Sequence, residues 1–582
     1  MSSKHFFNDP TQLLASCLQS VARCNPSVAA DVEGKTIYLK KRRNSHVSVI
    51  AGGGSGHEPS FVGMVGHGFL SAAVVGSIFA SPSADQVYRC LMQRVNRDQG
   101  ILIIIMNYTG DKLHFGMAVE KARANGVRTE LLVVCDDVGV GRSKAGRIGR
   151  RGLAGTLLVQ KVAGAAAAAG RSASFEEVYK TASLAAENVA TVGASLAHVH
   201  IPGRVVVPDE MNTSDDVEIG MGIHNEEGFG RVKTSLPDLI ETMLVQLLDT
   251  TDQERAFIDI QPSDPIVLLI NNLGGLSVLE LGGITNEVCL QLQGRFNLNV
   301  KRVLSGTYMS SLNGMGFSIS LLKLCDTGLG PGKSMLDLVD APVEANGWGP
   351  VIQPDTWEAK YEIEEGQPKE IMGDTKTMDI KRAVQILRAG LNRLIAAEPE
   401  VTRYDTLVGD GDCGLCLKTG AEAVLQHLNQ GQLSDDAALF VTDLAHVVET
   451  HMDGTSGAIY SIFLNSLTNS LREDAHHITG KVDVHTWATA LQSALQALGN
   501  YTPAKPGDRT LVDALQPFVE ALAASKDVEQ AIIACRKGYE STKGMEAQLG
   551  RSVYVGGTDW RTCPDPGAFG LYELLAGICG AL

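Results

Sequence analysis

The hydrophobic pattern of this chain changes close to residue 380. Before that point, short apolar runs such as HVSVIAGGG and GILIIIM alternate with helical stretches such as PSADQVYRCLMQRV. Strand, loop and helix in alternation predict parallel α/β sheets, which bind ligands at the carboxyl ends of their strands. After Lys381, apolar residues recur at helical spacing, and few strands are apparent. The second half is therefore predicted to be all-α.

A chain of 582 residues is too long for one hydrophobic core, so several domains are expected. The pattern predicts an N-terminal α/β domain over residues 1–342, with subdomains of about 1–195 and 196–342. Residues 343–378 mix Pro, Gly, Trp and charged residues without a period, and we interpret them as a linker. The helical domain is then expected over residues 379–582.

The composition argues against several classes of partner. The formal net charge is −16, and an acidic surface repels nucleic-acid phosphates and anionic lipid. The longest apolar stretch, VAGAAAAAG, is too short to span a bilayer, and the N-terminal segment does not resemble a secretory signal. Eleven scattered cysteines suit reduced thiols in the cytosol. We therefore expect a cytoplasmic protein without nucleic-acid or membrane partners.

A loop in the helical half, TRYDTLVGDGDCG, gathers the carboxylates of Asp405, Asp410 and Asp412 among small residues. Such a cluster repels itself unless a cation neutralises it, and hard oxygen ligands favour Mg²⁺. A solvated Asp-Gly turn is the alternative for this loop. The residue types alone leave these two interpretations about equally balanced.

Three further loops place small or polar residues just before apolar helices. They contain Thr455 and Ser456, then Arg509 and Thr510, and finally the run DPGAFG. Helix N-termini of this kind can cradle phosphates, although they also form ordinary N-caps. The sequence has no GxxxxGK[ST] motif, so an ordinary P-loop enzyme is excluded.

The α/β half has three polar, glycine-containing loops with titratable residues. GGGSGHEPS carries His57 and Glu58 after a strand, NYTGDKLHF presents Asp111 after the next strand, and GIHNEEG contains His224. Glycine-rich turns with surface histidines are the alternative, because a single histidine is more often structural than catalytic.

Taken together, these motifs resemble the single-chain, ATP-dependent dihydroxyacetone kinases over nearly the entire chain. The matches in the first half are GGGSGHEP, FASPSADQ, NYTGD, RRGLAGT, GIHNE and NNLGG. Those in the second half are GDGDCG, DGTSGA, PGDRT, GRSVY and DPGA. The resemblance implies an α/β substrate-binding K-type domain with two α/β subdomains, followed by an all-α helical-barrel L-type domain that binds the nucleotide.

The family pattern implies a role for each residue of the substrate site. His224 matches the histidine that adds to the ketone as a covalent hemiaminal, while Asp111 would accept the hydroxyl proton with help from His57. Substrate-binding residues would be Gly54, Ser55, Gly56, His57, Met106 and Asp111. Met106 is a departure, because the family usually has Lys there. Since Met cannot donate a hydrogen bond, Met106→Lys is expected to strengthen binding unless the site has repacked around Met.

The resemblance also implies the nucleotide site and the partners. Asp405, Asp410 and Asp412 match ligands of Mg²⁺. Residues expected to contact ATP are Asp410, Gly411, Asp412, Cys413, Thr455, Ser456, Gly499, Thr510, Leu511, Asp565, Pro566 and Gly567. The substrate would be dihydroxyacetone, with glyceraldehyde as a second triose, and the protein would be a homodimer through its K-type domains.

Three other functions remain open from the sequence. The first is a dihydroxyacetone phosphotransferase that takes its phosphate from a phosphoprotein. The second is an FAD-AMP lyase, or FMN cyclase, acting in the nucleotide domain, and the third is a regulator without activity. Both domains on one chain favour free ATP, and the complete aspartate loop argues against the regulator.

Overall fold

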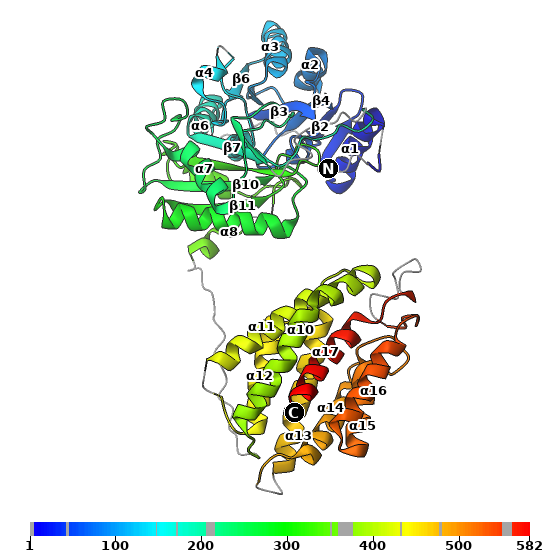
Figure 1. Ribbon diagram of the computed structural model, residues 1–582. Helices are drawn as coiled ribbons and strands as arrows, with labels where there is room; N and C mark the ends of the chain where they lie inside the picture. The colour runs from blue at the N-terminus through cyan, green and yellow to red at the C-terminus, as the bar shows by residue number, and fades with distance from the viewer. Residues whose placement is uncertain are drawn as a thin grey trace. The chain divides into compact units, whose positions relative to one another are not determined.

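The computed structural model describes residues 5–7, 9–41, 46–146, 148–169, 173–204, 216–349, 352–358, 376–430, 433–475, 480–549 and 561–582. The chain divides into two compact units, residues 1–363 and residues 364–582 (Figure 1). Within the described ranges, no helix combines the length and the apolar character that a membrane span would need.

The first unit is built on two six-stranded sheets. The first sheet has the order β1-β2-β4-β3-β5-β6, and β4, β3, β5 and β6 run parallel to one another. Its strands are β1 (Val28–Asp31), β2 (Thr36–Leu39), β3 (Ser48–Ser55), β4 (Ala72–Ile78), β5 (Ile101–Met106) and β6 (Thr129–Val134). Every residue of β3 and β5 is buried, as expected for central strands of a parallel sheet covered on both faces.

The second sheet has the order β11-β10-β12-β7-β8-β9, and only β10 and β11 are parallel. Its strands are β7 (Val189–Ser195), β8 (Val217–Ile219), β9 (Gly230–Val232), β10 (Pro265–Asn272), β11 (Asn299–Gly306) and β12 (Gly316–Lys323). The predicted subdomain boundary near residue 195 follows β7, but β7 pairs with β12 and so lies in the second sheet.

Helices form layers around both sheets (Figure 1). Between the sheets lies α5 (Gly155–Ala168), which contacts β3 and β5 of the first sheet and β7 and β12 of the second. The outer faces are covered by α2 (Ala84–Gln93) and α3 (Thr109–Ala124) on the first sheet, and by α7 (Leu236–Leu248) and α8 (Val278–Gly294) on the second. The remaining helices of this unit are α1 (Pro10–Cys24), α4 (Arg142–Ala145), α6 (Phe175–Glu187) and α9 (Met335–Asp340). This arrangement confirms the predicted pair of α/β layers.

Within its described residues, the second unit is built from helices, apart from isolated β-bridges at Thr377. Its elements are α10 (Ile380–Val408), α11 (Cys413–Asn429), α12 (Ala437–His451), α13 (Gly454–Ala475), α14 (Val484–Leu498), α15 (Val512–Ser525), α16 (Val528–Ser541) and α17 (Pro566–Ala581). Each helix packs against the next, and α17 packs against α10, so the helices close into a ring. The predicted all-α barrel is confirmed.

Candidate active site

The first part of the candidate site lies where the two sheets of the first unit meet. His57 follows β3 by two residues, and Asp111 lies in the first turn of α3, just beyond β5. His224 comes from the other sheet, in the loop after β8, yet its Nε2 lies 3.0 Å from Nε2 of His57. The structure therefore brings together residues that are 167 positions apart in the sequence.

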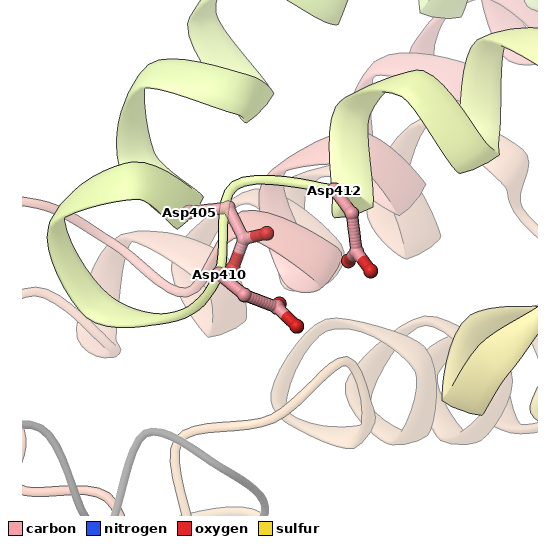
Figure 2. A group of neighbouring side chains, drawn as sticks. All are labelled: Asp405, Asp410 and Asp412. Carbon is pink, nitrogen blue, oxygen red and sulfur yellow. The ribbon is translucent and has the colours of Figure 1, made fainter. Parts of the chain in front are cut away.

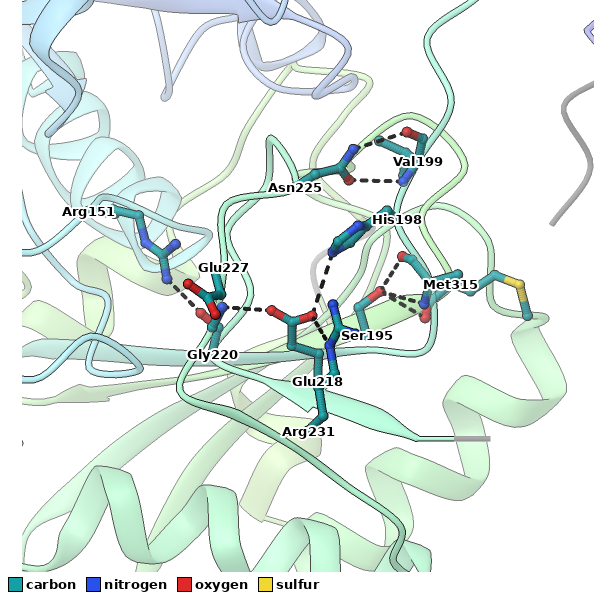
Figure 3. Close-up of polar contacts among 12 residues, drawn as sticks. Arg151, Ser195, His198, Val199, Glu218, Gly220, Asn225, Glu227, Arg231 and Met315 are labelled. Carbon is teal, nitrogen blue, oxygen red and sulfur yellow. Dashed lines mark hydrogen bonds and ion pairs between the residues drawn. The ribbon is translucent and has the colours of Figure 1, made fainter. Parts of the chain in front are cut away.

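The loop that carries His224 is fixed by polar contacts of the residues that follow this histidine (Figure 3). The side chain of Asn225 accepts a hydrogen bond from the backbone N–H of Val199, at 2.9 Å, and donates one to its carbonyl, at 3.0 Å. Further along the loop, the N–H of Gly228 donates to the buried carboxylate of Glu218 at 2.7 Å. Because Asn225 and Gly228, which both follow His224 in the loop, are held, the imidazole is presented on a rigid support.

The hydrogen bonds determine where the protons of the two imidazoles lie. Nδ1 of His57 is 2.9 Å from the carbonyl of Ser310, which can only accept, so Nδ1 carries a proton. Burial lowers the pKa of His57 to about 3, so this ring is neutral and its Nε2 accepts. Nε2 of His224 must then donate to His57.

The other ring nitrogen of His224 also donates. Its Nδ1 lies 2.7 Å from Oε1 of Glu226. Although burial works in the opposite direction, the hydrogen bonds from His224 lower the pKa of Glu226 to about 2, so this carboxylate is ionised. Both ring nitrogens of His224 therefore face hydrogen-bond acceptors. Transfer of its Nε2 proton to His57 would leave a nucleophilic lone pair at Nε2.

Asp111 is poised as a proton acceptor. Its side chain is 4% exposed, and burial raises its pKa to about 6. Its Oδ1 has no hydrogen-bond partner among the described residues. A buried carboxylate oxygen without a partner costs about 1–3 kcal/mol, so a hydroxyl donated by a ligand would be bound favourably here.

The predicted substrate-binding residues do not all face open space. The hydroxyl of Ser55 donates to the carbonyl of Gly76 at 2.7 Å, which ties β3 to β4. Met106 is 1% exposed and belongs to the hydrophobic core between the sheets. There it packs so closely on Gly152 that a Cβ on this glycine would lie 2.7 Å from Cβ of Met106. Its burial supports the alternative in which the chain has repacked around Met.

We expect Met106→Lys to destabilise the protein rather than improve it. An ammonium group placed in this apolar core loses its hydration, and the expected cost is about 1–3 kcal/mol. Melting curves should show a fall in Tm of roughly 2–10 °C, with no gain in kcat/KM for the substrate. Met106→Leu is the matched control and should stay close to the parent. A stable Lys variant with a higher kcat/KM would contradict this prediction.

The second part of the candidate site is the aspartate loop between α10 and α11 (Figure 2). Asp405 is in the last turn of α10, whereas Asp410 and Asp412 are exposed in the loop, and ligand oxygens of all three lie within 4.8 Å of one another. The loop is folded tightly, because a Cβ on Gly409 would lie 2.3 Å from Oδ1 of Asp405. Gly411 has a φ of 82°, which favours glycine. Three clustered oxygen ligands fit a hard divalent cation such as Mg²⁺.

Other helix starts lie beside this loop. The N–H of Cys413, at the start of α11, donates to Asp405, and its Sγ lies 3.9 Å from the hydroxyl of Ser456 in the first turn of α13. Asp565 caps α17 by accepting from the N–H of Ala568 at 2.8 Å. Burial, together with the nearby Asp405, raises the pKa of Asp565 to about 7. Several helix N-termini therefore surround the three carboxylates.

The remaining predicted nucleotide contacts are placed as follows. Leu511 is the N-cap of α15, and a Cβ on Gly567 would lie 3.6 Å from its Cβ, so α15 and α17 begin side by side. The hydroxyl of Thr510 accepts from the N–H of Val512. Gly499 is at the C-cap of α14, which is a helix end rather than a start. The motif GRSVY lies outside the described residues.

Comparisons with known proteins define the class of this chain. The model of the Dak1 domain matches residues 19–347, and the model of the DAK2 domain matches residues 407–580. A dihydroxyacetone kinase of Pichia angusta is 42% identical over 100% of this chain and 99% of its own length. The triokinase/FMN cyclase of Homo sapiens is 33% identical over 100% of both chains.

A solved structure supports the same assignment. The crystal structure of the dihydroxyacetone kinase from C. freundii in complex with AMP-PNP and Mg²⁺ covers 100% of both chains, with 27% identity and a TM-score of 0.63. The chain belongs to the dihydroxyacetone kinase family. The resemblance inferred from the sequence motifs is thereby confirmed.

Proposed function

We propose that this chain phosphorylates dihydroxyacetone with ATP while His224 holds the ketone as a hemiaminal. The observation that carries the proposal is the pair of imidazole Nε2 atoms, 3.0 Å apart, beside the unpartnered carboxylate oxygen of Asp111. A relative named dihydroxyacetone kinase that is 42% identical over the whole chain supports the choice of substrate. The solved kinase with bound AMP-PNP and Mg²⁺ supports the choice of phosphoryl donor.

The chemistry of capture follows from the hydrogen bonds of the two histidines. His224 passes its Nε2 proton to His57, and the freed lone pair attacks the carbonyl carbon. As the new C–N bond forms, the carbonyl π electrons move to the oxygen, which takes the proton back from His57. Glycerol has hydroxyls but no electrophilic carbon, so this step separates the ketone from glycerol.

Phosphoryl transfer would then use Asp111 and the aspartate loop. Asp111 accepts the proton of a terminal hydroxyl as its oxygen attacks the γ-phosphorus. Mg²⁺ held by Asp405, Asp410 and Asp412 would neutralise the phosphate charge and orient the γ-phosphoryl group. The helix starts at Cys413, Thr455, Ser456, Thr510, Leu511 and Asp565 to Gly567, with Gly411 and Gly499, are proposed to bind the nucleotide.

Several finer features of the prediction remain part of this proposal. They are the homodimer through the K-type domains, glyceraldehyde as a second substrate, the domain bounds 1–342 and 379–582, and the absence of nucleic-acid or membrane partners. The proposal also includes a cytoplasmic location, which fits eleven scattered cysteines that form no disulfide within the described residues.

One assay tests the proposed function. Purified protein is incubated with Mg-ATP and dihydroxyacetone, with no other protein present, and triose phosphate is followed by ³¹P NMR. We expect stoichiometric triose phosphate and ADP. Product formed only after a phosphoprotein donor is added would contradict ATP as the donor. Because a 33% identical relative is named triokinase/FMN cyclase, a parallel reaction with FAD and Mn²⁺ measures cyclic FMN.

The same assay gives a pH dependence. Asp111 must be ionised to accept a proton, and burial raises its pKa to about 6. We therefore expect kcat/KM for dihydroxyacetone to be full above this pH and to fall tenfold per unit below it. His57, with a pKa of about 3, stays neutral over that range. An acid limb near the ordinary carboxyl value of about 4 would show that Asp111 is not the base. The KM for ATP is recorded separately, because Asp565 would affect it.

A further inference from the structure

The residue after β4 has an unfavourable backbone conformation for its type. Phe79 has a φ of 59°, in the left-handed region that is costly for a bulky side chain. The turn is held by backbone hydrogen bonds from the N–H of Phe79 to Ser55, at 2.9 Å, and from the N–H of Ala80 to Ser77, at 3.0 Å. Strain of this kind persists only where the surroundings impose it, and it is often found at functional sites.

The glycine-rich loop after β3 is shaped around this turn. A Cβ on Gly54 would lie 3.0 Å from Cα of Phe79 and 2.9 Å from the backbone nitrogen of Ala80. A Cβ on Gly56 would lie 2.8 Å from Cε1 of the Phe79 ring. These two glycines therefore make room for Phe79, which is a different role from the ligand contact expected of them.

The Phe79 ring touches both histidines of the site. It stacks on His57, with ring centroids 5.2 Å apart and an interplanar angle of 15°. It meets His224 edge-on, at 5.1 Å and 85°. The two imidazoles are themselves at 80°, an arrangement that aligns their Nε2 atoms. A single apolar ring thus restricts the rotation of both imidazoles, which come from different sheets.

The same turn reaches the third member of the site. The hydroxyl of Ser81 donates a hydrogen bond to Asp111 and lowers its pKa, against the larger effect of burial. Gly110 leaves the space for this contact, because a Cβ there would lie 2.7 Å from Oγ of Ser81. The segment Phe79 to Ser81, which belongs to the FASPSADQ motif, therefore contacts His57, His224 and Asp111.

We propose that Phe79 is a positioning residue that holds the His57–His224 pair in the geometry for proton transfer, and that Ser81 does the same for Asp111. The inference rests on the proposed function. It gives this turn a role in the reaction, and it explains why an aromatic residue with a positive φ is found at position 79.

The test compares two variants at one position. Phe79→Leu keeps an apolar side chain but removes the flat ring, whereas Phe79→Tyr keeps the ring. In the full-length protein we expect the Leu variant to lose about 10- to 100-fold in kcat/KM for dihydroxyacetone and in the rate of ketone adduct formation. Its KM for ATP and its Tm should change little, and the Tyr variant should stay within about threefold of the parent.

Ser81→Ala provides an independent measurement. Loss of its hydrogen bond removes an effect that lowers the pKa of Asp111, so the acid limb of kcat/KM should move to higher pH. Adduct formation should not change. A purely structural role of the turn would alter Tm without moving this acid limb. If the Phe79→Leu variant does not fold, the Ser81→Ala measurement decides the question.

Two results would overturn the inference. One is a folded Phe79→Leu protein whose adduct formation and kcat/KM lie within twofold of the parent. The other is an acid limb that stays in place in Ser81→Ala. Failure of the proposed function looks different, because the parent protein itself would then form no adduct that depends on His224.

Discussion

Replacing His224 by alanine will abolish covalent capture of dihydroxyacetone. Nε2 of this residue is the atom placed 3.0 Å from its proton acceptor on His57, and Glu226 fixes the ring through Nδ1 at 2.7 Å. We expect kcat/KM for the ketone to fall by roughly 10²- to 10⁴-fold, the scale of a lost catalytic group. Discrimination against glycerol should fall with it, because the carbonyl carbon is no longer recognised.

Mass spectrometry under native conditions checks this result directly. The parent protein soaked with dihydroxyacetone should carry an adduct that the variant lacks. His67→Ala is the matched control, since this imidazole precedes the amino end of β4, whereas His57 follows the carboxyl end of the parallel strand β3. An adduct of unchanged abundance in His224→Ala would assign the nucleophile to another residue.

Removing one carboxylate of the aspartate loop should stop turnover while leaving ketone capture intact. Asp410 and Asp412 supply two of the three oxygen ligands that lie within 4.8 Å, and the two carboxylates that remain after either substitution would hold Mg²⁺ more weakly. For Asp410→Ala and Asp412→Ala we expect kcat with Mg-ATP to fall by about 10³-fold or more, on the scale of removing the groups that stabilise a transferred phosphoryl.

The design separates the two parts of the site. Each variant is assayed across a range of Mg²⁺ concentrations, and its adduct with dihydroxyacetone is measured by mass spectrometry. Glu422→Ala changes an exposed acid on α11 and should behave like the parent. Near-parental turnover of either aspartate variant at low Mg²⁺ would rule out the metal role of the loop. Loss of the adduct would show that the lesion is not confined to the second unit.

Most of the fold could be predicted because its strands and helices have recognisable local hydrophobic patterns. The run GILIIIM became β5, buried at every position, and the helical spacing after Lys381 became the closed ring α10 to α17. The membership of β7 could not be predicted in this way. Its sequence VATVGAS is equally suited to either sheet, and only its pairing with β12, more than a hundred residues away, assigns it.

For the candidate site, the sequence likewise indicates several of the residues but not the tertiary contacts between them. His57, Asp111 and His224 stand in recognisable loops, but their proximity depends on how two sheets meet. Glu226 was missed although it lies two residues after His224, because an acid in a polar loop carries no signal of its own. Phe79 was missed because a positive φ at an aromatic residue is set by tertiary contacts rather than by local sequence. The burial of Met106 likewise became visible only in the packed core.

The separate hydrophobic cores of the two units have a genetic consequence. Buried clusters in residues 1–363 and in residues 364–582 share no member, so damage to one unit should leave the other correctly folded. Alleles that are inactive for different reasons, such as His224→Ala and Asp412→Ala, should therefore both yield full-length protein with two folded units. A mutation that empties one of the cores should instead unfold its own unit alone.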